Sequence, residues 1–245
     1  MKKCSGVWAA AVLLLLGCSD EAKKPGDAAD DLRFAVCADY PPFEYYKAGH
    51  LVGLDVELAK LLAKKLGKTA SFADMPLGAM LASIQNETVD AALSAIEITE
   101  ERKAHCDFSN VYCNSGCAIV YKKNTPITRL EQVTSGKIAY QCGSSDHQKM
   151  LEEKAPTASL TAVDTVNVAI EMLKAGHVDY VFLDVVPART FCEKNEGLAY
   201  SSVAENSGYV LMFKQGSALR AKVNEALKEL ESSGELQMLK DKYLR

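Results

Sequence analysis

The 245-residue chain lacks several features that identify common classes of protein. Its longest apolar run, residues 7–16, is too short to span a bilayer, which takes about 20 consecutive apolar residues. It has no basic surplus, because 28 Lys and Arg oppose 32 Asp and Glu and the formal net charge is -4. Basic stripes, internal repeats and low-complexity stretches are also missing. These absences argue against a membrane-spanning helix, a nucleic-acid-binding surface and a repeat protein.

The N-terminus has the pattern of a bacterial lipoprotein signal. Two lysines precede the apolar run, and the small residue Gly17 stands directly before Cys18. We therefore expect residues 1–17 to be a cleaved signal peptide and Cys18 to carry lipid, which would anchor the protein to a membrane in the periplasm or cell envelope. A buried N-terminal helix is the alternative, but no polar face recurs at helical spacing. Residues 18–31 are polar and charged, which predicts a flexible tether.

The cysteines and histidines do not follow the spacing of a metal site. No Cys-x-x-Cys pair occurs and the four histidines stand at no ligand spacing, so we expect neither a zinc site nor another cofactor. Apart from Cys4 and Cys18, an even set remains: Cys37, Cys106, Cys113, Cys117, Cys142 and Cys192. In an exported protein these residues can form one or two disulfides or stay as buried thiols, and spacing does not decide between them.

The rest of the chain alternates between strand and helix patterns. Leucines recur at helical spacing from Leu54 and stop before Gly67, and Thr99 followed by two glutamates is typical of a helix start. The expected strands cover residues 32–38, 89–96, 117–121, 137–140, 178–183 and 209–213, and the expected helices cover residues 54–66, 80–84, 148–154, 166–174 and 218–230. This alternation predicts an α/β fold with ligands at the carboxyl ends of the strands.

Several motifs then occur in the order of a known family. They are Ala38-Asp39-Tyr40-Pro41-Pro42-Phe43-Glu44, the segment 53–59 (GLDVELA), the segment 98–102 (ITEER), and shorter matches at 107–109, 115–116, 173–179 and 234–236. The chain resembles the bacterial extracellular solute-binding family 3, the polar amino-acid receptors of ABC importers. The matches extend over essentially the whole chain after the tether.

The resemblance implies a two-lobed periplasmic-binding-protein-like fold of type II, with two crossover strands as hinge. Lobe 1 would comprise residues 32–115 and 215–245, and lobe 2 would comprise residues 116–214. The hinges would be residues 116–121 and 209–213. Family members close on the ligand like a jaw, so that ligand binding shifts the population from open to closed states.

A free amino acid presents a carboxylate and an ammonium, and a dry cleft must pair both charges. Arg102 can form a bidentate pair with the carboxylate, the role that the resemblance implies, whereas a surface arginine at a helix start is the alternative. By resemblance, Ser144 and Ser145 would complete the carboxylate site, and Asp184 would accept the ammonium. Plain helix capping is the alternative for all three.

Five more residues match family site positions. Tyr40 and Leu77 would flank the ligand side chain, whereas Phe43 is expected in the core. Ser94, Ala95 and Gln141 complete the expected ligand-binding set.

Three positions depart from the family pattern and bear on specificity. Cys37 stands where relatives that bind basic amino acids carry an aspartate, and Leu77 replaces a frequent phenylalanine. Glu97 stands where many relatives carry Ser or Thr. Its carboxylate could neutralise Arg102, bind the ligand ammonium with Asp184 or attract a basic side chain, so a basic ligand such as arginine is slightly favoured over a neutral one such as glutamine.

The resemblance implies a monomeric binding lipoprotein that performs no chemistry. It would deliver a polar L-amino acid to an ABC permease and its ATPase in the inner membrane. One rival is an enzyme of the cyclohexadienyl dehydratase type, with Glu97 or Asp184 as general acid. The other rival is a sensory module that reports ligand to a membrane partner.

Overall fold

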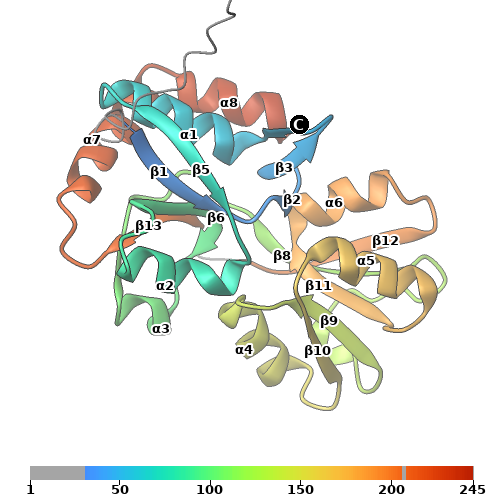
Figure 1. The fold of residues 1–245 in the computed structure, drawn as a ribbon. Helices are drawn as coiled ribbons and strands as arrows, with labels where there is room; N and C mark the ends of the chain where they lie inside the picture. The colour runs from blue at the N-terminus through green and yellow to red at the C-terminus, as the bar shows by residue number, and fades with distance from the viewer. Residues whose placement is uncertain (1–30, 206–207, 245) are drawn as a thin grey trace, which may run out of the picture.

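The computed structural model describes residues 31–205 and 208–244, which form two α/β lobes side by side (Figure 1). The expected signal peptide and Cys18 lie outside these residues. The first strand, β1 (Asp31–Val36), begins at the last residue of the predicted tether. No helix among the described residues is long and apolar enough to cross a membrane.

Lobe 1 contains a five-stranded sheet in the order β5-β1-β6-β13-β7. Strands β1, β5 (Thr69–Asp74) and β6 (Ala91–Glu97) are parallel, and β13 (Tyr209–Lys214) runs antiparallel to β6 and to β7 (Cys106–Phe108). The helices of this lobe are α1 (Leu54–Lys65), α2 (Met80–Gln85), α3 (Glu100–Lys103), α7 (Leu219–Ser232) and α8 (Glu235–Tyr243), with a 3-10 turn at Leu77–Ala79. A small sheet of β2 (Asp39–Tyr40), β3 (Glu44–Lys47) and β4 (His50–Val52) precedes α1.

Lobe 2 contains a second five-stranded sheet in the order β10-β9-β11-β8-β12. Its strands are β8 (Gly116–Lys122), β9 (Lys137–Gln141), β10 (Ser159–Val163), β11 (Tyr180–Asp184) and β12 (Leu198–Glu205). Its helices are α4 (Ser145–Lys154), α5 (Val166–Ala175) and α6 (Val185–Glu193), with a 3-10 turn at Leu130–Gln132. Strands β9, β10 and β11 are parallel, so their carboxyl ends lie at one edge of the sheet, which faces lobe 1.

Local patterns explain the elements that were predicted. The leucines of α1 form its buried face, with Leu54, Leu58 and Leu62 fully buried, and α1 ends just before Gly67, which has a positive φ of 68°. Thr99 caps α3, because its side chain accepts a hydrogen bond from the backbone N–H of Arg102 at 3.2 Å. Phe43 is fully buried in the core, as expected.

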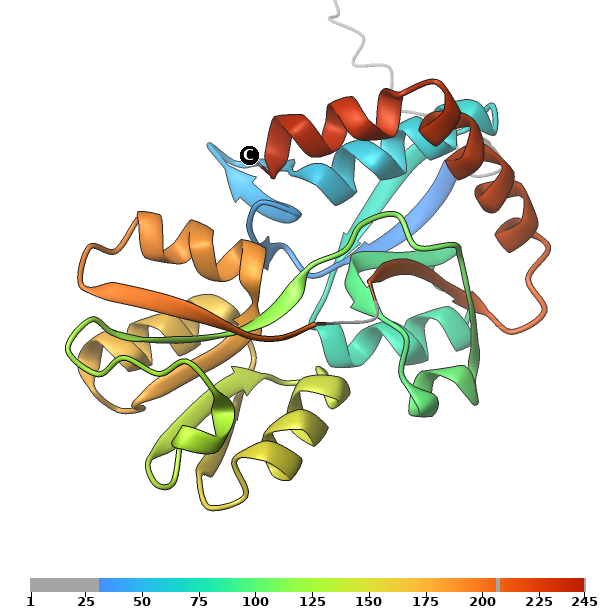
Figure 2. The ribbon, with the colours of Figure 1, turned by 180° about the vertical axis from the view of Figure 1, so that it is seen from behind.

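One strand lies in a different sheet from the expected one. Gly116–Lys122 and Tyr209–Lys214 are strands of the two large sheets, and Tyr209–Lys214 pairs in the sheet of lobe 1 rather than in that of lobe 2. The chain crosses between β7 and β8 and returns between β12 and β13, and the two crossings run side by side (Figure 2). A buried strand pattern identifies a strand but not its sheet, which is why the prediction was wrong by one element.

The six cysteines in the described part of the chain are all free thiols. Cys37, Cys106, Cys113 and Cys117 are buried, whereas Cys142 is exposed. The sequence left open disulfides or buried thiols, and the structure has no disulfide among these six residues.

Candidate functional site

A cavity lies between the lobes, next to the carboxyl ends of β1, β6, β9 and β11. Lobe 1 contributes Cys37, Asp39, Tyr40, Glu44, Leu77, Ser94, Ala95, Ile96, Glu97 and Arg102, and lobe 2 contributes Gln141, Ser144, Asp146, His147 and Asp184. All residues predicted for the ligand site line this cavity except Ser145. Ser145 lines an adjacent hollow with Gly78 and Gly143, because it is the first residue of α4 and its side chain leaves the helix in another direction than that of Ser144.

Arg102 connects the lobes at one end of the cavity. It projects from α3, and its Nη1 donates to the backbone carbonyl of Glu97 at 2.7 Å. Its Nη2 donates to the carbonyl of Gly143 in lobe 2 at 3.0 Å. In this conformation the guanidinium therefore bridges two backbone segments at the edge of the cavity that it lines.

Asp184 connects the lobes a second time. Its Oδ2 accepts a hydrogen bond from the Tyr40 hydroxyl at 2.8 Å, and its Oδ1 lies 3.3 Å from Nε2 of His147. It precedes α6 but makes no side-chain cap bond to that helix, and Ser144 makes none to α4. Helix capping therefore does not account for either side chain, and both line the cavity.

Asp39 is a cavity residue that the sequence analysis did not identify. Its carboxylate accepts hydrogen bonds from the Gln141 amide at 3.2 Å and from the backbone N–H of Val166, the first residue of α5, at 2.8 Å. The Cys37 thiol donates to the same carboxylate at 3.3 Å. Burial raises the pKa of Asp39. The Cys37 side chain has no carboxylate, but the carboxylate of Asp39 lies beside it.

Two buried carboxyl groups, Asp55 and Glu44, hold residues of the cavity wall in place. Asp55 accepts hydrogen bonds from the Ala95 backbone N–H and the Tyr112 hydroxyl, both at 2.8 Å, and burial raises its pKa to about 6. Glu44 accepts a hydrogen bond from the Ser94 hydroxyl at 2.7 Å. Burial and the charge of Asp55 raise the pKa of Glu44 well above its usual range, which favours its neutral form.

Glu97 and His147 meet in the middle of the cavity. Burial raises the pKa of Glu97 to about 8, and the charges of Asp146 and Asp184 act in the same direction. Burial alone would lower the pKa of His147, but Asp146 and Asp184 raise it well above its usual range.

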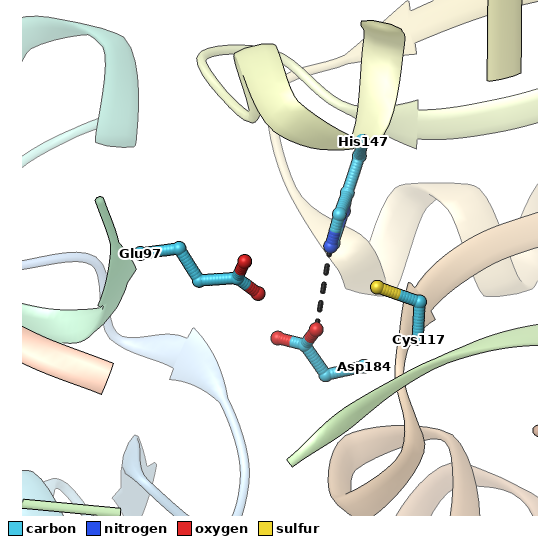
Figure 3. Close-up of side chains that lie close together, drawn as sticks. All are labelled: Glu97, Cys117, His147 and Asp184. Atoms are coloured by element: carbon cyan, nitrogen blue, oxygen red, sulfur yellow. Dashed lines mark hydrogen bonds and ion pairs between the residues drawn. The ribbon is translucent and has the colours of Figure 1, made fainter. Parts of the chain in front are cut away.

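Cys117 completes a cluster with these residues. Figure 3 shows the Cys117 sulfur, the His147 ring and the Asp184 carboxylate directed toward one another, with Glu97 opposite them. One ligand atom from each side chain lies within 4.8 Å of all the others. The sequence does not predict this set, because its members lie on four different elements and follow no local spacing.

Comparisons with known proteins bear on this geometry. Residues 32–245 match the family described as bacterial extracellular solute-binding proteins, family 3. The arginine-binding extracellular protein ArtP of Bacillus subtilis (strain 168) is 32% identical over 235 residues, which cover 94% of this chain and 92% of the relative. The glutamine-binding protein GlnH of an ABC transporter in the same organism is 29% identical over 255 residues, with 96% and 93% covered.

Two solved structures share the fold. An ancestral arginine-binding protein bound to arginine superimposes with a TM-score of 0.83 at 32% identity, covering 88% of this chain and 99% of that one. An ancestral amino-acid-binding protein, described as a precursor of cyclohexadienyl dehydratase, has a TM-score of 0.83 at 26% identity, with 89% and 96% covered.

Proposed function

Because the chain belongs to the bacterial extracellular solute-binding proteins, family 3, we propose that it captures an L-amino acid with a cationic side chain, arginine foremost, and delivers it to an ABC permease. In this proposal the ligand lies in the cavity between the lobes, its carboxylate on Arg102 and its ammonium on Asp184. Tyr40 and Leu77 flank its side chain, and the backbone and side chains around Ser94, Gln141 and Ser144 complete the enclosure.

The single observation that carries this proposal is the charge balance of the cavity. Five carboxyl groups line it: Asp39, Glu44, Glu97, Asp146 and Asp184. The raised pKa values of Glu44 and Glu97 favour their neutral forms. Against the remaining acids stand Arg102, the one Lys or Arg among the described lining residues, and His147, whose raised pKa favours its protonated form. A ligand with two positive groups and one carboxylate matches this arrangement, whereas a second carboxylate on the ligand would meet buried acids.

The relatives support the same class of ligand. Several carry names that state arginine binding, and the arginine-bound ancestral protein has the same two-lobed fold. Other relatives are named for glutamine or cystine, so the family does not by itself select a cationic side chain. In this chain the carboxyl groups of Glu97 and Asp39 would favour a ligand with a cationic side chain.

Thermal unfolding with a panel of ligands tests the proposal. Purified protein, refolded to remove carried ligand, is heated with arginine, lysine, ornithine, citrulline, glutamine or glutamate. A ligand at about a thousand times its Kd adds roughly 4 kcal/mol to the free energy of unfolding, which raises the Tm measurably. We expect arginine to give the largest shift and glutamate none. Equal shifts with glutamine and arginine would contradict the cationic preference, and no shift with any amino acid would contradict the whole proposal.

The anchor, the location and the oligomeric state belong to the same proposal. Lipid on Cys18 would hold a monomer at a membrane of the cell envelope, next to the permease and its ATPase. Mass spectrometry of protein from wild-type cells and from cells with Cys18→Ser tests this assignment. We expect a lipid-sized mass difference and release of the variant from membranes, and an unmodified, membrane-free wild-type protein would contradict it.

The enzyme alternative rests on one structural neighbour and one feature of the cavity. That neighbour is described as a precursor of cyclohexadienyl dehydratase, and two carboxyl groups that could act as general acids, Glu97 and Asp184, line the cavity here. Binding without chemistry predicts that prephenate and arogenate persist unchanged when they are incubated with the protein. Their turnover, lost in Glu97→Gln, would establish the enzyme instead.

A further inference from the structure

We propose that the cleft also binds a divalent transition-metal ion of the zinc type. Its ligands are four buried side chains of the cluster described above: Glu97, Cys117, His147 and Asp184. The metal site stands on this geometry alone, and only its competition with amino acids rests on the proposed function.

The fold holds three of these side chains in place from lobe 2. Cys117 on β8 and Asp184 on β11 are directly opposite each other in the antiparallel register, so their side chains lie on the same face of the sheet. His147 reaches this pair from the first turns of α4. Because the backbone of all three belongs to regular elements of one lobe, movement of one lobe against the other does not separate their backbones.

Glu97 adds the fourth side chain from lobe 1. It is the last residue of β6, pairs with Tyr209 on β13 and has only 7% of its surface exposed. A metal held by His147, Cys117 and Asp184 would therefore gain its last protein ligand as the lobes close.

The separations suit a small ion. Zn–S bonds are about 2.3 Å and Zn–N and Zn–O bonds about 2.0–2.2 Å, so that the donor atoms of a tetrahedral site lie roughly 3.3–3.7 Å apart. The His147 Nε2 to Asp184 Oδ1 distance is already 3.3 Å, and every pair in the cluster lies within 4.8 Å. Side-chain shifts that shorten the longer separations to this range would complete the coordination.

The donor chemistry selects the metal. One thiol, one imidazole and two carboxyl groups offer the mixed S, N and O set that Zn²⁺ and its late first-row neighbours prefer, whereas Ca²⁺ and Mg²⁺ take oxygen ligands. On binding, the metal forms a bond to the Cys117 sulfur and the thiol proton passes to solvent, as do any protons on His147 and Glu97.

Neighbouring groups already orient these ligands as outer groups do in metal sites. The Tyr40 hydroxyl donates to Oδ2 of Asp184 at 2.8 Å, which leaves Oδ1 directed at His147. The His147 ring is held edge-on against Phe182, with ring centroids 5.0 Å apart.

A metal at this position would exclude an amino-acid ammonium from Asp184. The two ligands would then compete for one cleft, and zinc would act as an inhibitor of amino-acid capture. This consequence can be measured on the unchanged protein, without any substitution in the cavity.

The experiment uses the purified protein, reduced and stripped with EDTA. One sample is titrated with ZnCl2 by calorimetry. A second, metal-free sample is titrated with CoCl2 and followed by absorption spectroscopy, which reports thiolate-to-cobalt charge transfer. We expect one equivalent of metal and a charge-transfer band that is lost in Cys117→Ser but kept in the matched variant Cys142→Ser, whose thiol is exposed. His147→Gln should lower the zinc affinity by at least about tenfold, and saturating arginine should weaken zinc binding to the unchanged protein.

The outcomes separate this inference from the proposed function. No zinc binding, or a charge-transfer band that persists in Cys117→Ser, would overturn the metal site and leave a hydrogen-bonded cluster. If Cys117→Ser does not fold, His147→Gln and the arginine competition decide. Arginine is titrated separately in EDTA. A protein that binds arginine but not zinc overturns only the metal site. A protein that binds zinc but not arginine overturns only the amino-acid proposal.

Discussion

Arg102 and Gly143 join the two lobes through a single hydrogen bond, in which Nη2 of the guanidinium donates to the glycine carbonyl at 3.0 Å. The same guanidinium donates to the carbonyl of Glu97 at 2.7 Å, so one side chain is hydrogen-bonded to the backbone of both lobes. Closure of the cleft and the arrangement of its one arginine are therefore coupled.

Arg102→Lys is expected to weaken binding of every amino acid. A lysine cannot form two parallel hydrogen bonds with a carboxylate, and a hydrogen bond to a charged group contributes about 1.5–3 kcal/mol, which corresponds to roughly 10- to 150-fold in Kd. Calorimetric titration with arginine measures the loss. The matched control is Arg220→Lys, an exposed position on α7. Near-wild-type affinity in Arg102→Lys would contradict the carboxylate assignment.

Gly143→Ala is expected to hold the lobes apart. Gly143 has a φ of 93°, and an added Cβ would lie 2.7 Å from the backbone nitrogen of Gly78 in the opposite lobe. Overpacking of this kind costs about 1–3 kcal/mol, which closure can avoid only by staying incomplete. We expect weaker arginine binding and a radius of gyration, from small-angle scattering, that no longer decreases when arginine is added.

The control for this variant is Gly197→Ala, where an added Cβ would meet nothing within 4 Å. Circular dichroism checks that both variants fold. Ligand-induced compaction of Gly143→Ala equal to that of the wild type would show that this contact does not limit closure.

Glu97→Thr is expected to change the order of ligand preference. The substitution removes a carboxyl group from a cavity whose acids favour a cationic side chain, so affinity for arginine should fall relative to glutamine. The ratio of the two Kd values is the measurement, because a general loss of binding cancels in it. An unchanged ratio would show that Glu97 has no part in ligand selection.

Glu44→Gln is expected to flatten the pH dependence of stability. The pKa of buried Glu44 is raised by desolvation and by Asp55, so the folded state binds more protons than the unfolded state above the ordinary pKa of 4.5. Stability from this group is therefore lost as the pH rises from about 4.5 toward the raised pKa. Glutamine resembles the neutral acid and cannot titrate, so its Tm should fall less between pH 5 and 8.

Thermal unfolding over this pH range provides the comparison. Glu153→Gln, an exposed position on α4, serves as the matched control and should follow the wild type. Parallel curves for Glu44→Gln and the wild type would contradict the raised pKa of Glu44.

The sequence predicted what local patterns can encode. The leucines of α1 and the Thr99 cap determine their elements within a few residues of chain, and the structure has both. The family motifs extended this to the two-lobed fold and to most of the cavity. Strand β13 was assigned to the wrong lobe, because its apolar residues pack equally well in either sheet and only the pairing with β6 and β7 decides.

The parts of the site that sequence reasoning missed depend on long-range contacts. Asp39 becomes a link between the lobes only because α5 presents the N–H of Val166 to it, 127 residues later in the chain. The meeting of Cys117, His147 and Asp184 depends in the same way on the register of β8 with β11 and on the start of α4. No spacing rule connects such residues, although an acid within a family motif, such as Asp39, is a signal that could have been followed.

A crystal structure of the protein with arginine tests the central claim most directly. The account predicts one arginine between the lobes, its carboxylate on the Arg102 guanidinium, its ammonium on Asp184 and its side chain between Tyr40 and Leu77. An arginine bound in the reverse direction, or density elsewhere on the protein with an empty cleft, would contradict the account.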